Sequence, residues 1–308
     1  MKIAILGASS QIARELIVSL ASNRKVELVL YGRVLDFIKE WCSKKIPTAS
    51  YDIYDIKFFD PKTKFDVIIN FVGVGNPVLA KEMGRKIFDI TEEFDFMALS
   101  NLELHPDTKY IFLSSGAVYG GKFHEPVDES SKAQFDINHL SFTDWYAIAK
   151  FYTEARHRAQ PQFHITDIRV FNYFSASQDL NARFLISDMI RAIKKKSVML
   201  TSVDNIVRDF ITPEDFYRLV CSIIDSPPVN QALDCYSKAP VDKFTLLDQM
   251  SDKYGLEYRV EETNVAVNAT GTKYKYYSVN YAAGKIGYQP ERTSLEGVLE
   301  QVALILNE

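Results

Sequence analysis

Short apolar segments alternate with amphipathic segments through the first 170 residues, and this alternation restricts the chain to few folds. Five segments are almost continuously hydrophobic, as buried parallel strands are: 2–6, 26–31, 66–71, 109–114 and 165–170. Amphipathic stretches with helical spacing lie between them, at 12–20, 81–99 and 145–159. Strands that alternate with helices in this way predict a doubly wound parallel sheet of the Rossmann-like α/β class.

The pattern is less regular after residue 170. Helices are expected at 183–195, 213–224 and 294–306, and a further strand at 232–236. We therefore predict a dinucleotide-binding domain over residues 1–170. A smaller mixed α/β substrate lobe is expected over 171–308, with some of its elements returning to the first domain.

Composition excludes several classes of protein. The 308 residues are 47% hydrophobic, enough for a sizeable core, and the net charge of -4 argues against a general nucleic-acid or membrane-surface binder. The first expected strand begins at Lys2 and no apolar run could span a bilayer, so a cytoplasmic protein without membrane attachment is predicted. The three cysteines are expected to be reduced, and the five histidines lack metal-ligand spacing, so no metal is expected.

A glycine-containing turn follows the first strand directly. Its sequence, GASSQIA over residues 7–13, joins a strand to a helix, the setting in which backbone N–H groups and a helix N-terminus bind a pyrophosphate. Small residues occupy the later glycine positions of such a loop and still allow close approach. Cofactor contacts are predicted from Gly7, Ser9, Ser10, Gln11 and Ile12, with an ordinary small-residue turn as the alternative.

The end of the second strand bears on the choice between NAD and NADP. An acidic residue there would bind the ribose 2′-hydroxyl and repel a 2′-phosphate, whereas this chain has Gly32 and Arg33. NADP is therefore the preferred cofactor in our prediction, and NAD is the alternative. Asp52 and Ile53, placed after the third strand, are predicted to contact adenine, although Asp52 also suits a turn. Val72, after the fourth strand, completes the predicted cofactor set.

A Tyr146-x-x-x-Lys150 step lies in a helical stretch downstream of Ser115. Positions i and i+4 share a helix face, so the Lys150 ammonium is expected beside the Tyr146 ring. A nearby cation favours the phenolate of a side chain whose pKa is otherwise near ~10. Tyr146 can then exchange a proton with a substrate hydroxyl or carbonyl while Ser115 holds the same oxygen. A second such step, Tyr281 to Lys285, is interpreted as a surface helix end.

The order and spacing of these motifs, over nearly the whole chain, resemble the extended short-chain dehydrogenases/reductases, the NAD-dependent epimerase/dehydratase family. The matching pieces are the Gly7 loop, SSGAVYG at 114–120, the Tyr146 step, RVFN at 169–172, RDFI at 208–211 with Asp215, and GYQP at 287–290.

The resemblance implies a nucleotide-diphosphate sugar substrate bound between the lobes. Ser115, Tyr146 and Lys150 would form the catalytic set, and Tyr146 and Lys150 would also contact the cofactor. By the same matching, Asn172 and Arg208 are expected to bind the diphosphate of the substrate, a role that suits the planar arginine fork. The alternative for Arg208 is a salt bridge to Asp209 or Asp204.

Departures from the family pattern narrow the reaction. Gly116 and Ala117 replace the acidic pair of members that dehydrate sugars, so a 4,6-dehydratase is not expected. The fourth strand ends in NFVGVG at 70–75 rather than the usual His-Leu-Ala-Ala, and Asp89 and Asp95 stand where the next helix usually carries asparagines.

The predicted activity is an NADP-preferring keto-sugar reductase in which Tyr146 donates the proton. A nucleotide-sugar epimerase with retained NAD(P) is the alternative, and a non-catalytic dinucleotide-binding sensor on the same fold is a third possibility. The resemblance also suggests a homodimer formed by the helices at 81–99 and 145–159.

Overall fold

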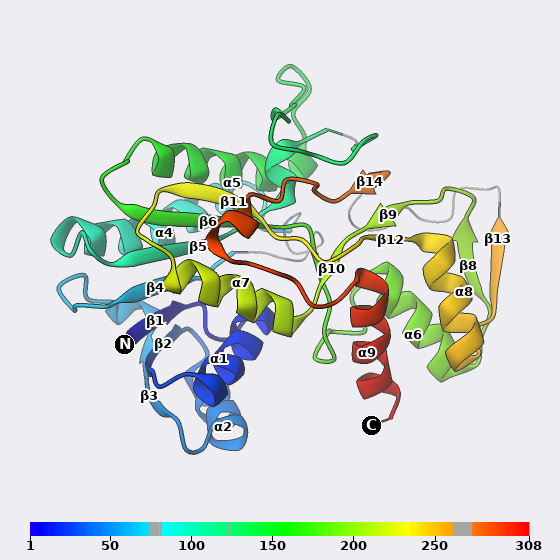
Figure 1. The fold of residues 1–308 in the computed structure, drawn as a ribbon, viewed down its shortest axis with the longest axis horizontal. Helices are drawn as coiled ribbons and strands as arrows, with labels where there is room; N and C mark the ends of the chain where they lie inside the picture. Colours follow the sequence, from blue (N-terminus) through cyan, green and yellow to red (C-terminus); the bar gives the residue numbers. More distant parts are fainter. Residues whose placement is uncertain (74–79, 81, 122, 262–272, 308) are drawn as a thin grey trace.

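A parallel sheet of seven strands forms the centre of the molecule. The computed structural model describes residues 1–73, 80, 82–121, 123–261 and 273–307. The strand order is β11-β6-β5-β4-β1-β2-β3, and each neighbouring pair is parallel (Figure 1). The strands are β1 (Lys2–Leu6), β2 (Glu27–Gly32), β3 (Ser50–Asp55), β4 (Val67–Asn70), β5 (Lys109–Ser115), β6 (His164–Val170) and β11 (Gln231–Asp234). The predicted doubly wound α/β fold is confirmed.

Helices cover both faces of this sheet. One face carries α1 (Gln11–Asn23), α2 (Leu35–Lys45) and α7 (Pro213–Asp225), and the other carries α4 (Lys86–Leu104) and α5 (Phe142–Arg158). Successive strand residues point to opposite faces, so Ile3 and Ile5 pack in the core with α1 and α7, whereas Ala4 and Leu6 pack in the core with α4. Burial on both faces explains why the strands are almost wholly apolar.

The C-terminal part builds a smaller lobe at one end of the sheet, on the right in Figure 1. Its core is made by α6 (Leu185–Lys195), α8 (Lys243–Tyr254) and α9 (Ser294–Leu306). Short strands border it: β7 (Asn172–Tyr173), β8 (Met199–Ser202), β9 (Val207–Arg208), β10 (Phe210–Ile211), β12 (Val241–Asp242), β13 (Tyr258–Glu261) and β14 (Lys275–Tyr276). Because α7 and β11 pack with the main sheet, the two lobes share elements, and the boundary near residue 170 stays a prediction.

Most predicted elements lie within a few residues of the observed ones. Two helices, α2 and α8, carry few buried apolar residues, so the sequence marks them weakly; in α2 only Ile38 and Cys42 are buried. The helix predicted over 81–99 is interrupted: residues 82 and 83 are helical, a turn follows at 84 and 85, and α4 begins at Lys86. Residues 74, 75 and 81 of the predicted motifs lie outside the described residues. Within the described part of the chain, no helix combines the length and apolar character needed to cross a membrane.

Candidate active site

The predicted site residues meet at the carboxyl edge of the sheet. Leu6 of β1 pairs with Asn70 of β4, and Asn70 pairs with Phe112 of β5. Gly7 and Val72, which follow β1 and β4, and Ser115, which ends β5, therefore lie at the same edge of the sheet. In doubly wound sheets this edge is where ligands bind.

Gly7 makes a turn that only glycine accommodates well. Its φ is +79°, and a Cβ at this position would lie 3.1 Å from the backbone N of Val72. Its N–H donates to the carbonyl of Tyr31 at 3.0 Å, as does the N–H of the next residue. The turn thus packs directly against the ends of β2 and β4 and brings the N-terminus of α1 to the carboxyl edge, as a pyrophosphate site requires.

The other predicted loop residues also lie in this turn. Ser10 caps α1, and its hydroxyl accepts a hydrogen bond from the Ala13 N–H at 3.3 Å. Gln11 donates from Nε2 to the Ser175 hydroxyl at 2.7 Å, which ties the turn to the start of the C-terminal lobe. Ser9 and Ile12 are half-buried beside them. Their contacts with a cofactor stay a prediction, and the geometry fits one.

The prediction that Asp52 and Ile53 follow the third strand is wrong, because both residues lie within that strand. The strand β3 continues to Asp55, and the Asp55 carboxylate caps the short 3-10 helix η1 (Ile56–Phe58) by accepting from the Lys57 N–H at 3.0 Å. The polar residues in this edge strand hide its true end from the sequence pattern. Arg33 does follow β2 as predicted, and it is exposed.

Ser115 and Tyr146 are brought together by β5 and α5. Ser115 ends β5 and starts the 3-10 helix η2 (Gly116–Tyr119), where its hydroxyl accepts from the Ala117 N–H at 3.1 Å. Burial raises the pKa of Tyr146 above its ordinary value, and a hydrogen bond with Ser115 opposes that rise. This rise in the Tyr146 pKa is opposite in direction to the shift expected from a neighbouring ammonium.

Lys150 lies deeper in the same face of α5. Its side chain is 4% exposed, and its Nζ donates to the Leu113 carbonyl at 2.8 Å and lies 4.2 Å from the centre of the Phe112 ring. Burial lowers the pKa of Lys150 to about 8, and nearby carboxylates oppose that fall. A Cβ on Gly73 would lie 3.3 Å from Nζ, so the glycine after β4 leaves room for the ammonium.

Arg208 of β9 faces this site without a carboxylate partner among the described residues. It is buried, its Nη1 donates to the Val207 and Tyr274 carbonyls at 2.9 and 3.4 Å, and burial lowers its pKa to about 10. The predicted alternative of a salt bridge is wrong for Asp209, whose carboxylate accepts from Ser237 and Ser294 instead. Among the described residues, Asp204 does not form a salt bridge with Arg208 either.

Lys273 is a second cation at this wall that the sequence did not mark. Its Nζ lies 4.1 Å from the centre of the Tyr276 ring, and both burial and the nearby Arg208 charge lower its pKa, to about 8. Asn172 stands next to them, and its Nδ2 donates to the carbonyls of Asp209 and Tyr276 at 3.2 and 3.5 Å. Two neighbouring cations that repel each other, the buried Arg208 and the half-buried Lys273, are a ready site for an anion.

Tyr276 is a second phenol close to Ser115. It is buried on β14, is paired with Arg208 of β9, and lies close enough to Ser115 and Tyr146 for both to influence its pKa. Burial raises the pKa of Tyr276 as well. The sequence shows Tyr276 only as one of several tyrosines in a Lys- and Tyr-rich segment, so no local signal identified it.

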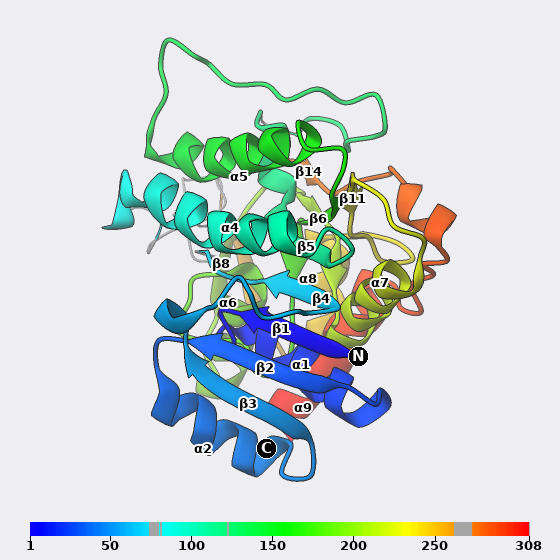
Figure 2. The same cartoon turned by 90° about the vertical axis from the view of Figure 1, so that its left-hand side faces the viewer.

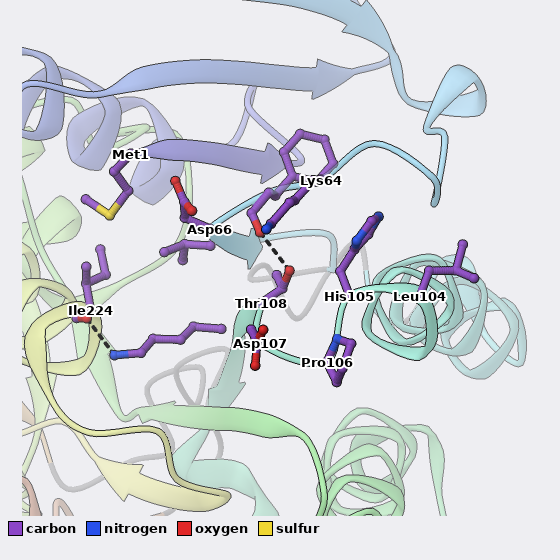
Figure 3. Close-up of a pocket in the computed structure, with 12 residues that line it drawn as sticks. Met1, Lys64, Asp66, Leu104, His105, Pro106, Asp107, Thr108 and Ile224 are labelled. Atoms are coloured by element: carbon purple, nitrogen blue, oxygen red, sulfur yellow. Dashed lines mark hydrogen bonds between the residues drawn. The ribbon is translucent and has the colours of Figure 1, made fainter.

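A separate cavity of about 680 Å³ lies at the opposite edge of the sheet (Figure 3). Asp66, just before β4, and Thr108, just before β5, are among its lining residues, and Thr108 donates to the Phe65 carbonyl at 2.7 Å. Because these residues precede the strands, the cavity is remote from the carboxyl edge. It is not the candidate active site.

Three further observations concern residues outside the site. Tyr281 is 59% exposed and precedes the 3-10 helix η3 (Ala282–Ile286), so its interpretation as part of a surface helix end is confirmed. Cys42, Cys221 and Cys235 are free thiols in the structure. The described residues contain no cluster of three potential metal ligands.

Comparison with known proteins places the chain in a family. The family model "NAD dependent epimerase/dehydratase family" matches residues 3–234, and no curated protein shows significant sequence similarity. Similar solved structures include UDP-glucuronic acid 4-epimerase from Bacillus cereus, with 15% identity and a TM-score of 0.78, covering 100% of this chain and 99% of that one. UDP-glucose 4-epimerase from Thermotoga maritima has 14% identity and a TM-score of 0.80, with the same coverage.

UDP-N-acetylglucosamine 4-epimerase from Methanobrevibacter ruminantium has 18% identity and a TM-score of 0.79, covering 99% of this chain and 98% of that one. At these identities the structures demonstrate a common fold. The family model covers most of the chain, including the Gly7 turn, Ser115, Tyr146 and Lys150. The chain therefore belongs to the NAD dependent epimerase/dehydratase family of enzymes, the extended short-chain dehydrogenases/reductases.

Proposed function

We propose that the protein is an NAD(P)-dependent nucleotide-sugar epimerase. The observation that carries the proposal is the convergence of Ser115 and Tyr146 near Lys150, close to the buried Arg208 and the half-buried Lys273. One similar structure is a 4-epimerase solved with UDP-glucuronic acid and NAD. That similarity supports an epimerase more than the keto-sugar reductase predicted from the sequence.

Each residue has a chemical task in this reaction. The chemistry supplied by NAD(P) is the acceptance and return of a hydride. Tyr146 takes the proton of the sugar hydroxyl during oxidation and gives it back during reduction, while Ser115 holds that oxygen. Lys150 supports the phenolate through its positive charge. Arg208 and Lys273 hold the diphosphate, so the keto sugar can turn its other face to the cofactor without leaving the enzyme.

Turnover with a panel of UDP-sugars and UDP-keto-sugars tests the proposal, with products identified by NMR. Conversion of a sugar to its epimer with less cofactor than substrate is the expected result. Consumption of one NADPH per keto-sugar would instead identify a reductase. Absence of both reactions across the panel would contradict an oxidoreductase acting on these substrates.

The reductase is the second candidate because the end of β2 suits NADP. Arg33 follows β2, and α2 begins two residues later without a side-chain cap on its first N–H groups. The Arg14 guanidinium lies 5.3 Å from the centre of the Phe37 ring in the first turn of α2, and its buried Nε has no hydrogen-bond partner among the described residues. Two arginines beside an open helix N-terminus suit a 2′-phosphate.

The Arg33→Ala variant should bind NADPH about 10–100-fold more weakly and NADH unchanged, because a charged hydrogen bond to the 2′-phosphate is lost. Calorimetric titration with the two cofactors measures both affinities. Lys45→Ala, which removes an exposed charge from the other end of α2, is the matched control. An equal loss of affinity for both cofactors would show that Arg33 does not contact the 2′-phosphate.

A homodimer through α4 and α5 is also proposed. The two helices lie side by side on one face of the molecule (Figure 2). Phe96 of α4 is 60% exposed, and Phe151 and Tyr152 of α5 are 45% and 49% exposed. Clustered exposed aromatic side chains of this kind are typical of protein interfaces.

Phe151→Glu should therefore convert a dimer to a monomer in sedimentation velocity, because it buries a charge in the interface. Phe58→Glu changes an equally large exposed side chain elsewhere on the surface and should leave the dimer intact. A wild-type protein that sediments as a monomer at micromolar concentration would rule out this assembly.

A further inference from the structure

The buried face of α5 carries a second set of charges beyond the catalytic pair. Lys150 is followed on this face by Glu154 at i+4 and His157 at i+7, and all three are buried. Glu154 is paired with Arg169 at 2.6 Å. His157 belongs to a separate cluster in the core, and the reaction outlined above gives it no role.

His157 lies between two carboxylates. Its Nε2 is 2.7 Å from Asp95 Oδ1 of α4, and its Nδ1 is 2.6 Å from Asp167 Oδ1 of β6; the exposed fraction of all three side chains is 0%. Both ring nitrogens face acceptors, so both must donate, which makes the ring an imidazolium. Burial alone would lower the pKa of His157, but the two carboxylates raise it to about 9.

Asp95 is the member of this cluster whose charge is least neutralised. Asp167 has a second cation, Arg158, whose Nη2 lies 2.8 Å from Oδ2. By contrast, Asp95 Oδ2 is buried and has no hydrogen-bond partner among the described residues; the Arg156 Nη1 atom lies 3.9 Å from it. A buried carboxylate oxygen left without a hydrogen bond is costly, so its presence calls for a compensating role.

The Phe112 ring lies between this cluster and Lys150 and contacts both. The His157 ring packs edge-on against Phe112 with centres 5.4 Å apart, and the Lys150 ammonium lies over the same ring. The carboxylates that face Lys150 come from three elements: Asp95 of α4, Asp167 of β6 and Glu154 of α5. Each favours its charged form against the effect of burial.

The cluster also reaches the turn after β4. Asp95 Oδ1 accepts from the Tyr110 hydroxyl at 3.0 Å, and that hydroxyl accepts from Asn70 Nδ2 at 3.0 Å. Asn70 Oδ1 in turn accepts from the Val72 N–H at 2.9 Å. One chain of hydrogen bonds therefore links the charge behind Lys150 to the backbone predicted to contact the cofactor.

We propose that Asp95 and His157 are positioning residues for the reaction. With Asp167 they form a buried ion chain whose net negative charge favours the charged form of Lys150, the ammonium that donates to Leu113 and lies over Phe112, while the His157 charge limits this effect. The consequence for turnover rests on the proposed function, but the effect on Lys150 itself does not.

Two substitutions that should shift the titration midpoint of Lys150 in opposite directions test the ion chain. Asp95→Asn removes a negative charge and should lower the titration midpoint of Lys150, because Asp167 still contacts the imidazolium. His157→Gln removes a positive charge and should raise that midpoint. Each shift should be about one pH unit. NMR titration of ¹³Cε-labelled lysine measures the midpoint without any substrate, and Lys150→Arg identifies the signal.

Controls separate charge from packing. Tyr110→Phe removes a hydrogen bond to Asp95 but no charge, and should leave the midpoint of Lys150 in place. If His157→Gln does not fold, Arg156→Gln removes a partly exposed positive charge near Asp95 and should shift the midpoint upward. Shifts of the same sign, no shifts, or an equal shift in Tyr110→Phe would overturn the proposal.

The same variants should move the pH dependence of kcat in the same directions as the Lys150 midpoint. A wild-type protein without turnover would count against the proposed function alone, since the NMR titration still decides on the ion chain. Opposite midpoint shifts with an unmoved kcat profile would show that the chain does not act on the reaction, which would overturn its role as a positioning device.

Discussion

The Tyr146→Phe variant is expected to lose about 10²–10⁴-fold in kcat, because the site loses the hydroxyl that carries the proton. Affinity for the cofactor and the nucleotide sugar should change little, since the phenol ring and its packing are kept. Single-turnover measurement of hydride transfer, together with calorimetric binding, separates the two effects.

Two matched variants sharpen this test. Tyr281→Phe removes an exposed hydroxyl from the second Tyr-x-x-x-Lys step and should have wild-type activity. Tyr276→Phe removes the other phenol close to Ser115, and should lower kcat much less than Tyr146→Phe. A larger loss of kcat in Tyr276→Phe than in Tyr146→Phe would indicate that Tyr276, not Tyr146, carries the proton.

The Arg169→Met variant should lose about 3–5 kcal/mol in the free energy of unfolding, because it leaves two buried carboxylates without their cation. Arg169 donates from Nη2 to Glu154 at 2.6 Å and from Nη1 to the Tyr119 hydroxyl at 2.8 Å, and it lies 3.5 Å from Asp234. Urea unfolding followed by circular dichroism measures the loss.

The pH dependence of that loss has a definite sign. Burial raises the folded-state pKa of Glu154 and Asp234, and Arg169 opposes the rise. Without Arg169 the pKa of both rises further, so the folded variant binds protons more readily than the unfolded chain. The deficit should therefore shrink as the pH falls and widen as it rises.

A control variant sets the scale of this loss. Arg24→Met, which removes one partner of the exposed Asp225, should lower the free energy of unfolding by no more than about 1 kcal/mol. A loss in Arg169→Met no larger than that would contradict a structural role for the buried ion pairs.

The sheet and half of the candidate site could be predicted, because each depends on a pattern of residues that are close together in the sequence. Strands buried on both faces are apolar at every position, as 2–6 is, and the turn at Gly7 follows from a glycine placed between such a strand and a helix. Tyr146 and Lys150 share a helix face through their spacing alone. The end of β3 could not be located in the same way, because Tyr54 and Asp55 continue an edge strand with polar residues.

The sequence by itself determined the fold class, the glycine turn after the first strand and the shared helix face of Tyr146 and Lys150. Only the tertiary structure decided that Tyr276 meets Ser115, that Lys273 joins Arg208, and that Asp95 and His157 lie behind Lys150. These contacts join segments separated by many residues, so they depend on strand pairing and helix packing. The periodicity of a segment indicates which of its residues are buried, but it does not indicate which other segments pack against it. Those contacts form only when the whole core packs.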